Sequence, residues 1–202
     1  MPRTPQKNEA LRAATRAAVV DAAVRVFSRH GFAASSIRQI AEEAGLSIGS
    51  IYRHYASKEE LFDDLLEQAS AGLATASQAL ASDADPLELV RDFTAVFLSD
   101  IAQGKGAAEF YLVINQGFIT DTPNGTAERL ATTQRALWDA FAVLVRRGQR
   151  TGQFADGDPA QVTAYYFAML SGIATMRLVI QDELTAPGVG LVLRLLTGEG
   201  TK

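Results

Sequence analysis

The chain contains no cysteine and only two histidines, and these shortages exclude several kinds of function. Without cysteine it forms no disulfide and no thiolate nucleophile. Both histidines, His30 and His54, lie near the N-terminus, and Asp156 and Asp158 are carboxylates of the kind found in loops. An enzyme needs a nucleophile with its base, a carboxylate pair or metal ligands that meet in a cleft. We therefore expect no catalysis, no bound metal and no cofactor.

Long apolar runs and a leader pattern are also absent. A membrane-spanning helix needs a run of about 18 or more apolar residues, and the sequence contains no such run. The first residues lack the charged and then apolar pattern of a secretory leader. The sequence therefore predicts a cytoplasmic protein that has no membrane partner.

Acidic residues outnumber basic ones by 23 to 19, but the two kinds are unevenly distributed. Up to Lys58 there are nine basic and four acidic residues, which gives this region a net charge of +5. The remainder has ten basic and nineteen acidic residues, a net charge of −9, and the two regions sum to −4. Since salt confines each patch to a range of about 10 Å, the basic region can attract phosphates. The alternative is an ordinary solvated charged surface.

Apolar residues recur with a helical period along nearly the whole chain, and no strand pattern accompanies them. The sequence predicts an all-α protein of about nine helices. Residues 1–56 are expected to form a three-helix head and residues 57–202 a larger helical domain. Residues 1–9 are polar with two prolines and predict a loose arm. A first helix is expected from about Leu11 to His30.

Within the head, the segment from Ser35 to Leu61 predicts two short helices around a glycine turn. The first opens at Ser36, whose side chain can cap the first turn together with Gln39. It closes at Gly45, and Leu46 packs the turn against the apolar face.

The second short helix is expected to begin at Ser47 and to carry Ile48, Ile51 and Tyr55 inward. Two helices joined by a short turn with glycine form a helix-turn-helix, whose second helix enters the major groove of DNA. The sequence therefore predicts a DNA-binding head. The residues that the second helix leaves outside are Ser47, Gly49, Ser50, Arg53 and His54.

A fourth helix is expected to connect the head to the rear domain. It begins at Ser57 with a capping box to Glu60 and extends to about Leu80. Asp85 and Pro86 form a cap and first-turn pair for the next helix. Two apolar segments are expected to be largely buried, at residues 107–118 and 137–145. The last two helices are expected at about 159–181 and 189–196.

The head carries a dense set of spaced residues: Gly31-Phe32, Ile40-Ala41, Ala44 to Ser47, Ile51 to Tyr55, and Ser57 to Glu59 with Leu61. In these residues, the segment 12–62 resembles the DNA-binding head of the tetracycline-repressor (TetR) family of transcriptional regulators. The resemblance implies a homodimer that binds a palindromic operator. It also implies that an apolar or cationic small molecule binds among the rear helices and releases the DNA. The alternative is a DNA-binding regulator or architectural protein without an inducer.

Candidate DNA contacts follow from side-chain chemistry and from this resemblance. Tyr52 and Lys58 are the strongest phosphate candidates, and His54 and Ser36 are weaker ones. Arg38 and Arg53 can each place a guanidinium on guanine, although Arg53 can equally bind phosphate. The remaining candidates are Ser47 on the outer face, Ile48 for a thymine methyl, Gly49 for close approach, and Ser50 for a base or phosphate.

The rear helices supply candidates for a ligand cavity and a subunit interface. Aromatic and apolar residues there are core residues by default, but their excess of Tyr, Trp and Met favours a lined cavity. A stripe of small residues on the helix after Pro159 predicts pairing with a second subunit, with packing inside one subunit as the alternative. The cavity candidates are Phe97, Phe110, Tyr111, Ile114, Asn115, Trp138, Phe141, Tyr166 and Met169. The interface candidates are Ala164, Ala168, Ser171, Thr175 and Leu178.

Overall fold

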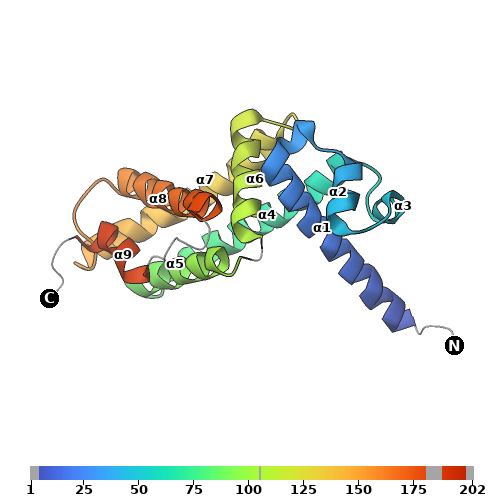
Figure 1. The fold of residues 1–202 in the computed structure, drawn as a ribbon. Helices are drawn as coiled ribbons and strands as arrows, with labels where there is room; N and C mark the ends of the chain where they lie inside the picture. Colours follow the sequence, from blue (N-terminus) through green and yellow to red (C-terminus); the bar gives the residue numbers. More distant parts are fainter. Residues whose placement is uncertain (1–4, 105, 181–187, 199–202) are drawn as a thin grey trace.

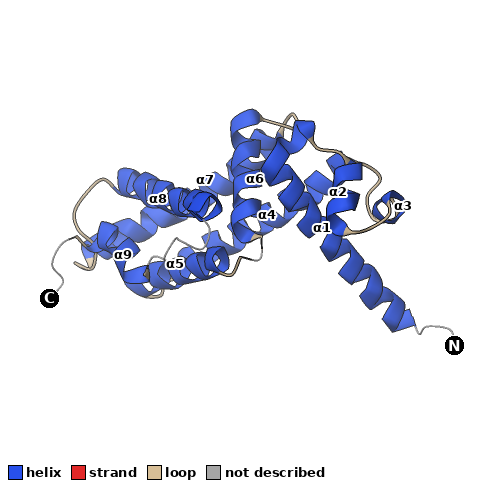
Figure 2. Ribbon diagram, viewed as in Figure 1, coloured by secondary structure: helices blue, strands red, loops and turns tan. Residues whose placement is uncertain are grey.

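The structure, a computed structural model, describes residues 5–104, 106–180 and 188–198. These residues form nine helices and no strand (Figure 2), which confirms the predicted all-α class. The predicted end of the eighth helix near Gln181 lies outside the described residues. The helices are α1 Pro5–Ala34, α2 Ile37–Ala44, α3 Ile48–Ile51, α4 Lys58–Leu80, α5 Pro86–Ala102, α6 Ala107–Thr120, α7 Thr126–Arg150, α8 Pro159–Ile180 and α9 Val189–Thr197.

The molecule is elongated, with α1 to α3 at one end and α5, α8 and α9 at the other (Figure 1). Helices α4, α6 and α7 lie between the two ends. We call α1 to α3 the head and α5 to α9 the body. Because α4 runs from the head into the body, it is the predicted connector.

Helix α1 begins earlier than predicted. The expected loose arm is wrong for residues 5–9, which form the first turns of α1, while residues 1–4 lie outside the described residues. Proline is tolerated in the first turn of a helix, and most of the residues that follow Pro5 have good helix propensity. Residues 8–14 are exposed, and this part of α1 projects from the head (Figure 1). The helix bends at Gly31, whose φ of 72° suits glycine.

The hydrophobic core of the head extends past the predicted domain boundary at Ala56. Phe27 of α1 packs edge-on against Phe62 of α4, with ring centroids 5.5 Å apart. Val113 of α6 and Leu130 of α7 belong to the same cluster of buried side chains. The head is therefore packed directly against the body helices.

A second core lies in the body and centres on Tyr166 of α8. The ring of Tyr166 stacks on Phe141 at 4.4 Å between centroids, and its hydroxyl forms a 2.7 Å hydrogen bond with the hydroxyl of Thr94. Burial raises the pKa of Tyr166, so this phenol remains protonated. The hydroxyl of Thr94 also donates to the carbonyl of Val90, which allows a polar side chain to be buried here.

One of the two apolar segments predicted to be largely buried needs correction. Residues 107–118 are buried or half-buried throughout, as expected, but Val143 on α7 is 50% exposed and Trp138 is 37% exposed. On α5, Val96 is 62% exposed, whereas Thr94 and Leu98 are buried. The helical period alone does not show that a threonine hydroxyl has partners inside the core.

Candidate DNA-binding surface, cavities and subunit interface

Local hydrogen bonds define α2 as predicted. The side chain of Ser36 accepts from the backbone N–H of Gln39 at 3.3 Å, which caps the first turn. Gly45 adopts a left-handed conformation with φ 65°, and the N–H of Leu46 donates to the carbonyl of Ala41 at 2.9 Å. Because these bonds lie within the segment, they could be predicted from its sequence.

Helix α3 is only four residues long and is followed by turns, so it is shorter than the predicted second helix. Ser47 caps it by accepting from the N–H of Ser50 at 3.1 Å. The hydroxyl of Ser50 also accepts from Arg53 at 2.7 Å, and Ser50 is buried. The prediction that Ser50 faces outward is therefore wrong. Ile48, expected inside, is 43% exposed and can contact DNA.

Tyr52 and Arg38 form the outer part of this surface. Tyr52 is 55% exposed, while Tyr55 is buried, in agreement with the sides predicted for the two tyrosines. The side chain of Arg38 is 78% exposed and pairs with Glu42 one turn away at 3.1 Å. An exposed i,i+4 pair is weak in water, so the guanidinium of Arg38 can exchange this partner for DNA. Gly49 is exposed and His54 is half-buried.

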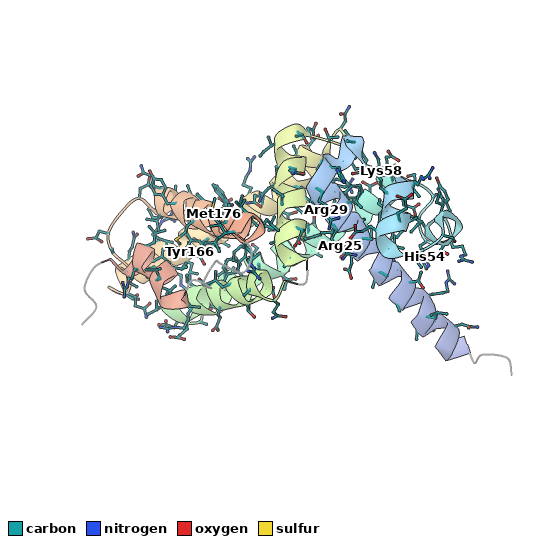
Figure 3. The ribbon with its side chains drawn as sticks, in the orientation of Figure 1. Arg25, Arg29, His54, Lys58, Tyr166 and Met176 are labelled. Atoms are coloured by element: carbon teal, nitrogen blue, oxygen red, sulfur yellow. The ribbon has the colours of Figure 1, made fainter. Side chains whose placement is uncertain are left out.

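Lys58 does not project into solvent as a phosphate ligand would. Its ammonium donates to the carbonyls of Phe32 at 2.7 Å and Ser35 at 2.8 Å, and lies 4.2 Å from the centroid of the Phe32 ring. Figure 3 shows Lys58 on the head, close to the end of α1. The carbonyl of Phe32 also accepts from the backbone N–H of Ser35 at 3.2 Å, and Lys58, the first residue of α4, supplies the further donor. Lys58 thus ties α1 to the connector with two of its three donors, and its phosphate contact stays a prediction.

A second set of contacts joins α1 to α4 through Tyr55. The hydroxyl of Tyr55 donates to the carboxylate of Asp64 at 2.5 Å and accepts from Arg16 at 3.0 Å, and Arg16 also pairs with Asp64 at 2.8 Å. Burial and the bond to Asp64 raise the pKa of Tyr55 to about 12, so the phenol remains a donor at neutral pH. These contacts hold the residues that follow α3 in a fixed position on the connector.

A cavity of about 250 Å³ lies between α4, α5, α6, α7 and α8, and we call it the effector cavity. Its wall is mainly apolar and aromatic, and no charged residue contributes to it. Three lining residues, Gln68, Asn115 and Gln134, carry side-chain amides that have no hydrogen-bond partner among the described residues. Five of the nine predicted cavity residues line it: Phe97, Phe110, Tyr111, Ile114 and Asn115.

The other four predicted cavity residues lie elsewhere. Phe141 and Tyr166 are fully buried in the body core, and Met169 packs against the same core. Trp138 stacks on Phe167 with centroids 5.7 Å apart, and Phe167 itself lines the cavity. Trp138 therefore contacts a residue of the cavity wall but does not line the cavity itself. Sequence reasoning missed Gln68, Gly72 and Gln134, because the face of a long helix that meets a cavity depends on how the helices pack.

The predicted stripe of small residues on α8 divides between two faces. Ala168 and Thr175 are exposed, whereas Ser171 forms a 2.7 Å hydrogen bond with Tyr111. Ala164 is half-buried, and Leu178 packs against the cluster around Ile101. The exposed face of α8 therefore contains only part of the predicted set.

Large apolar side chains accompany Ala168 and Thr175 on the exposed face. Tyr165 is 65% exposed and Val179 is 69% exposed. Among the described residues, α8 is the one helix long and apolar enough to cross a membrane, with a mean hydropathy of 1.3, and 28% of that window is buried. Interface helices of proteins outside membranes meet the same criteria. The exposed apolar residues of α8 and α9 are Tyr165, Met176, Val179, Ile180, Leu191 and Leu195.

Known proteins match both the head and the whole chain. Residues 19–65 match the family described as bacterial regulatory proteins, tetR family. The chain is 34% identical over 152 residues to NicS, an HTH-type transcriptional repressor of Pseudomonas putida, covering 70% of this chain and 66% of NicS. It is 27% identical over 182 residues to TtgR, an HTH-type transcriptional regulator of Pseudomonas putida, covering 86% and 85% of the two chains.

A solved structure shows the same fold. The SmeT protein in its complex with triclosan superposes with a TM-score of 0.66 at 20% identity, and the match covers 93% of each chain. The likeness therefore extends over both the head and the body.

We expect Lys58→Met to destabilise the protein, because it removes one of the two donors to the carbonyl of Phe32 and the side-chain donor to the carbonyl of Ser35. The expected loss in the free energy of unfolding is about 1–3 kcal/mol, measured by urea denaturation. Arg38→Met is the matched control, because its exposed pair should contribute little. Equal stability of the two variants would show that the contacts of Lys58 do not hold the head.

Proposed function

Since the chain belongs to the tetR family of bacterial regulatory proteins, we propose that this transcriptional regulator is a homodimeric repressor released from a palindromic operator by a small uncharged molecule. The observation that carries the proposal is the position of α4. Leu61 and Leu65 of this helix belong to the core of the head, and Gln68 and Gly72 of the same helix line the effector cavity. A change in the cavity therefore acts on an element packed into the head.

The chemistry of the cavity wall supports an uncharged effector. No carboxylate or cationic side chain lines the cavity, so a buried ionic group of a ligand would have no opposite charge. The amides of Gln68, Asn115 and Gln134 can each donate to and accept from a polar group. SmeT, which has the same fold, binds triclosan, an aromatic molecule with a hydroxyl group. The proposed effector is therefore a largely apolar molecule with one or two hydrogen-bonding groups.

The proposed switch acts through the distance between two heads. Two recognition helices of a dimer must match half-sites about 34–36 Å apart or a multiple of that spacing. A ligand changes DNA affinity only if it prefers one arrangement of the heads over another. A molecule that separates α6 and α7 from α4 would tilt α4 and move its head away from the spacing that the operator requires.

The exposed apolar face of α8 and α9 supports the proposed subunit interface. Ala168 and Thr175 allow a partner helix to approach closely, and Tyr165, Met176 and Val179 supply apolar area around them. Such an area on one subunit is typical of an interface rather than of a free surface. We place the two-fold axis of the dimer at this face. The complete regulator would act in the cytoplasm, where it meets operator DNA.

Tyr52→Ala and Arg38→Ala should weaken DNA binding in different ways. Loss of Tyr52 removes a phosphate contact, so affinity should fall by a similar factor for every DNA sequence. Loss of Arg38 removes a base contact, so preference at one base pair should relax, at a cost of about 1–3 kcal/mol for the selected operator. Both are measured by fluorescence anisotropy with operator and single-mismatch duplexes. Unchanged affinity for both variants would contradict the proposed orientation on DNA.

Ala168→Arg should convert the dimer into folded monomers. It would place two like charges in a desolvated two-fold contact. The matched control is Ala95→Arg, at an exposed position on α5, which should stay dimeric. Sedimentation velocity gives the mass of each variant, and circular dichroism confirms that both are helical. If the Ala168→Arg variant stays dimeric, the subunit interface lies on another face of the protein.

Occupation of the effector cavity should alter the emission of Trp138, the only tryptophan, because its stacking partner Phe167 lines the cavity. Triclosan is the first probe, followed by a library of uncharged aromatic compounds. A bound compound should lower operator affinity roughly 5- to 150-fold over the same concentration range.

The matched control for this experiment is Gly72→Leu. An added Cβ at Gly72 has no neighbour within 4 Å, so the larger side chain can occupy cavity space. This variant should bind operator but lose the response to the compound. If a compound saturates the Trp138 signal while operator affinity stays constant, the protein is a DNA-binding regulator without this inducer mechanism.

A further inference from the structure

A second cavity, of about 470 Å³, lies where the head meets the body. Its walls come from the end of α1, from Phe62 of α4 and from the stretch of α6 between Val113 and Thr120. It shares no lining residue with the effector cavity. We call it the junction cavity, and nothing in the proposed switch makes use of it.

The floor of the junction cavity is aromatic. Phe27, Phe32 and Phe62 pack against one another with ring centroids between 4.9 and 5.6 Å apart, and all three line the cavity. Phe32 is held in place by Lys58, which bonds to its carbonyl and lies beside its ring. Phe27 and Phe62 are each 1% exposed, so the half-buried ring of Phe32, which they support from behind, is the aromatic surface that a ligand can contact.

The rim of the cavity is positively charged. Arg29 and His30 line it, and no carboxylate does. Arg29 pairs with Glu43 at 2.8 Å, but Glu43 also pairs with Arg25 at 2.6 Å, so the three residues carry one net positive charge. In Figure 3, Arg25 and Arg29 lie along α1 where it passes α6. The side chain of Arg29 is 56% exposed, so its remaining donors can reach a molecule at the rim.

A neutral polar group completes the site. Gln116 of α6 lines the cavity and is half-buried, and its side-chain amide has no hydrogen-bond partner in the part of the chain that the structure describes. The hydroxyl of Thr120 is already used, since it donates to the backbone carbonyl of Gln116. The amide of Gln116 can therefore donate to a ligand oxygen.

We propose that the junction cavity binds small aromatic carboxylates, separately from the effector cavity. The ring of the ligand packs on Phe32, and its carboxylate lies at Arg29 and His30. A guanidinium forms its strongest hydrogen bonds with an anionic oxygen. The position on α1 and α6 places such a ligand in contact with head and body at once.

The experiment uses 1-naphthoate, which is fluorescent, with the full-length protein at neutral pH and without DNA. Methyl 1-naphthoate, which keeps the rings and loses the charge, is the ligand control. Naphthoate should bind with saturation, and the ester should bind roughly tenfold more weakly. Equal binding of the acid and the ester would overturn the proposed role of the charged rim.

Two arginine variants test whether an arginine that lines the junction cavity contributes more to binding than a neighbouring arginine that does not. Arg29→Met and Arg25→Met each lose one bond to Glu43, but only Arg29 lines the junction cavity. Arg29→Met removes the guanidinium at the rim and should weaken naphthoate binding roughly tenfold, while Arg25→Met keeps that guanidinium and should have a clearly smaller effect. Equal effects of the two variants would mean that a general loss of positive charge is responsible, and would overturn the proposal.

Two further variants distinguish the two cavities. Ala33→Phe, at an exposed position that lines the junction cavity, should block naphthoate and leave any Trp138 response to uncharged compounds intact. Gly72→Leu should leave naphthoate binding intact. Loss of naphthoate binding in Gly72→Leu would assign it to the effector cavity and overturn the proposal. Absence of any naphthoate binding would overturn it as well, without bearing on the proposed repressor function.

Discussion

The structure depends on one helix that belongs to two hydrophobic cores. Leu61, Phe62, Leu65 and Leu66 of α4 are buried in the head, and Leu80 near its end is buried in the body. Neither core is complete without α4, because each buries a different part of its length. This shared packing supports the proposal that movement of α4 in the body is transmitted to the head, since the packed interiors of proteins resist small deformations. The effector cavity, which borders the middle of α4, is the proposed input.

Side-chain contacts at the start of α4 hold the head to this helix. Lys58 holds the end of α1 by its carbonyls, and Asp64 holds Tyr55 and Arg16. Charged and buried hydrogen bonds of this kind fix orientation more than they add stability. These contacts support the proposal that the head moves with α4 as one unit.

The sequence predicted features that depend on local chemistry and failed where packing decides. The caps at Ser36, Ser57 and Asp85 and the glycine end of α2 were all correct, because each uses atoms within a few residues. The outward side predicted for Ser50 was wrong because α3 ends after Ile51 and Ser50 packs inward, and the sequence did not indicate the contacts of Lys58 with carbonyls more than twenty residues earlier. No pattern in a single sequence indicates such partners.

Packing also decides which of the predicted cavity residues line the effector cavity. Phe97 and Tyr111 pack edge-on against each other at the cavity wall, whereas Phe141 and Tyr166 stack in the body core. All four are aromatic residues on amphipathic helices, so their type and spacing do not distinguish a wall from a core. The polar groups beside them differ: the half-buried amides of Asn115 and Gln134 have no hydrogen-bond partner among the described residues, whereas the hydroxyl of Tyr166 pairs with Thr94. Asn115 was predicted from the sequence as a cavity residue, and it lines the effector cavity.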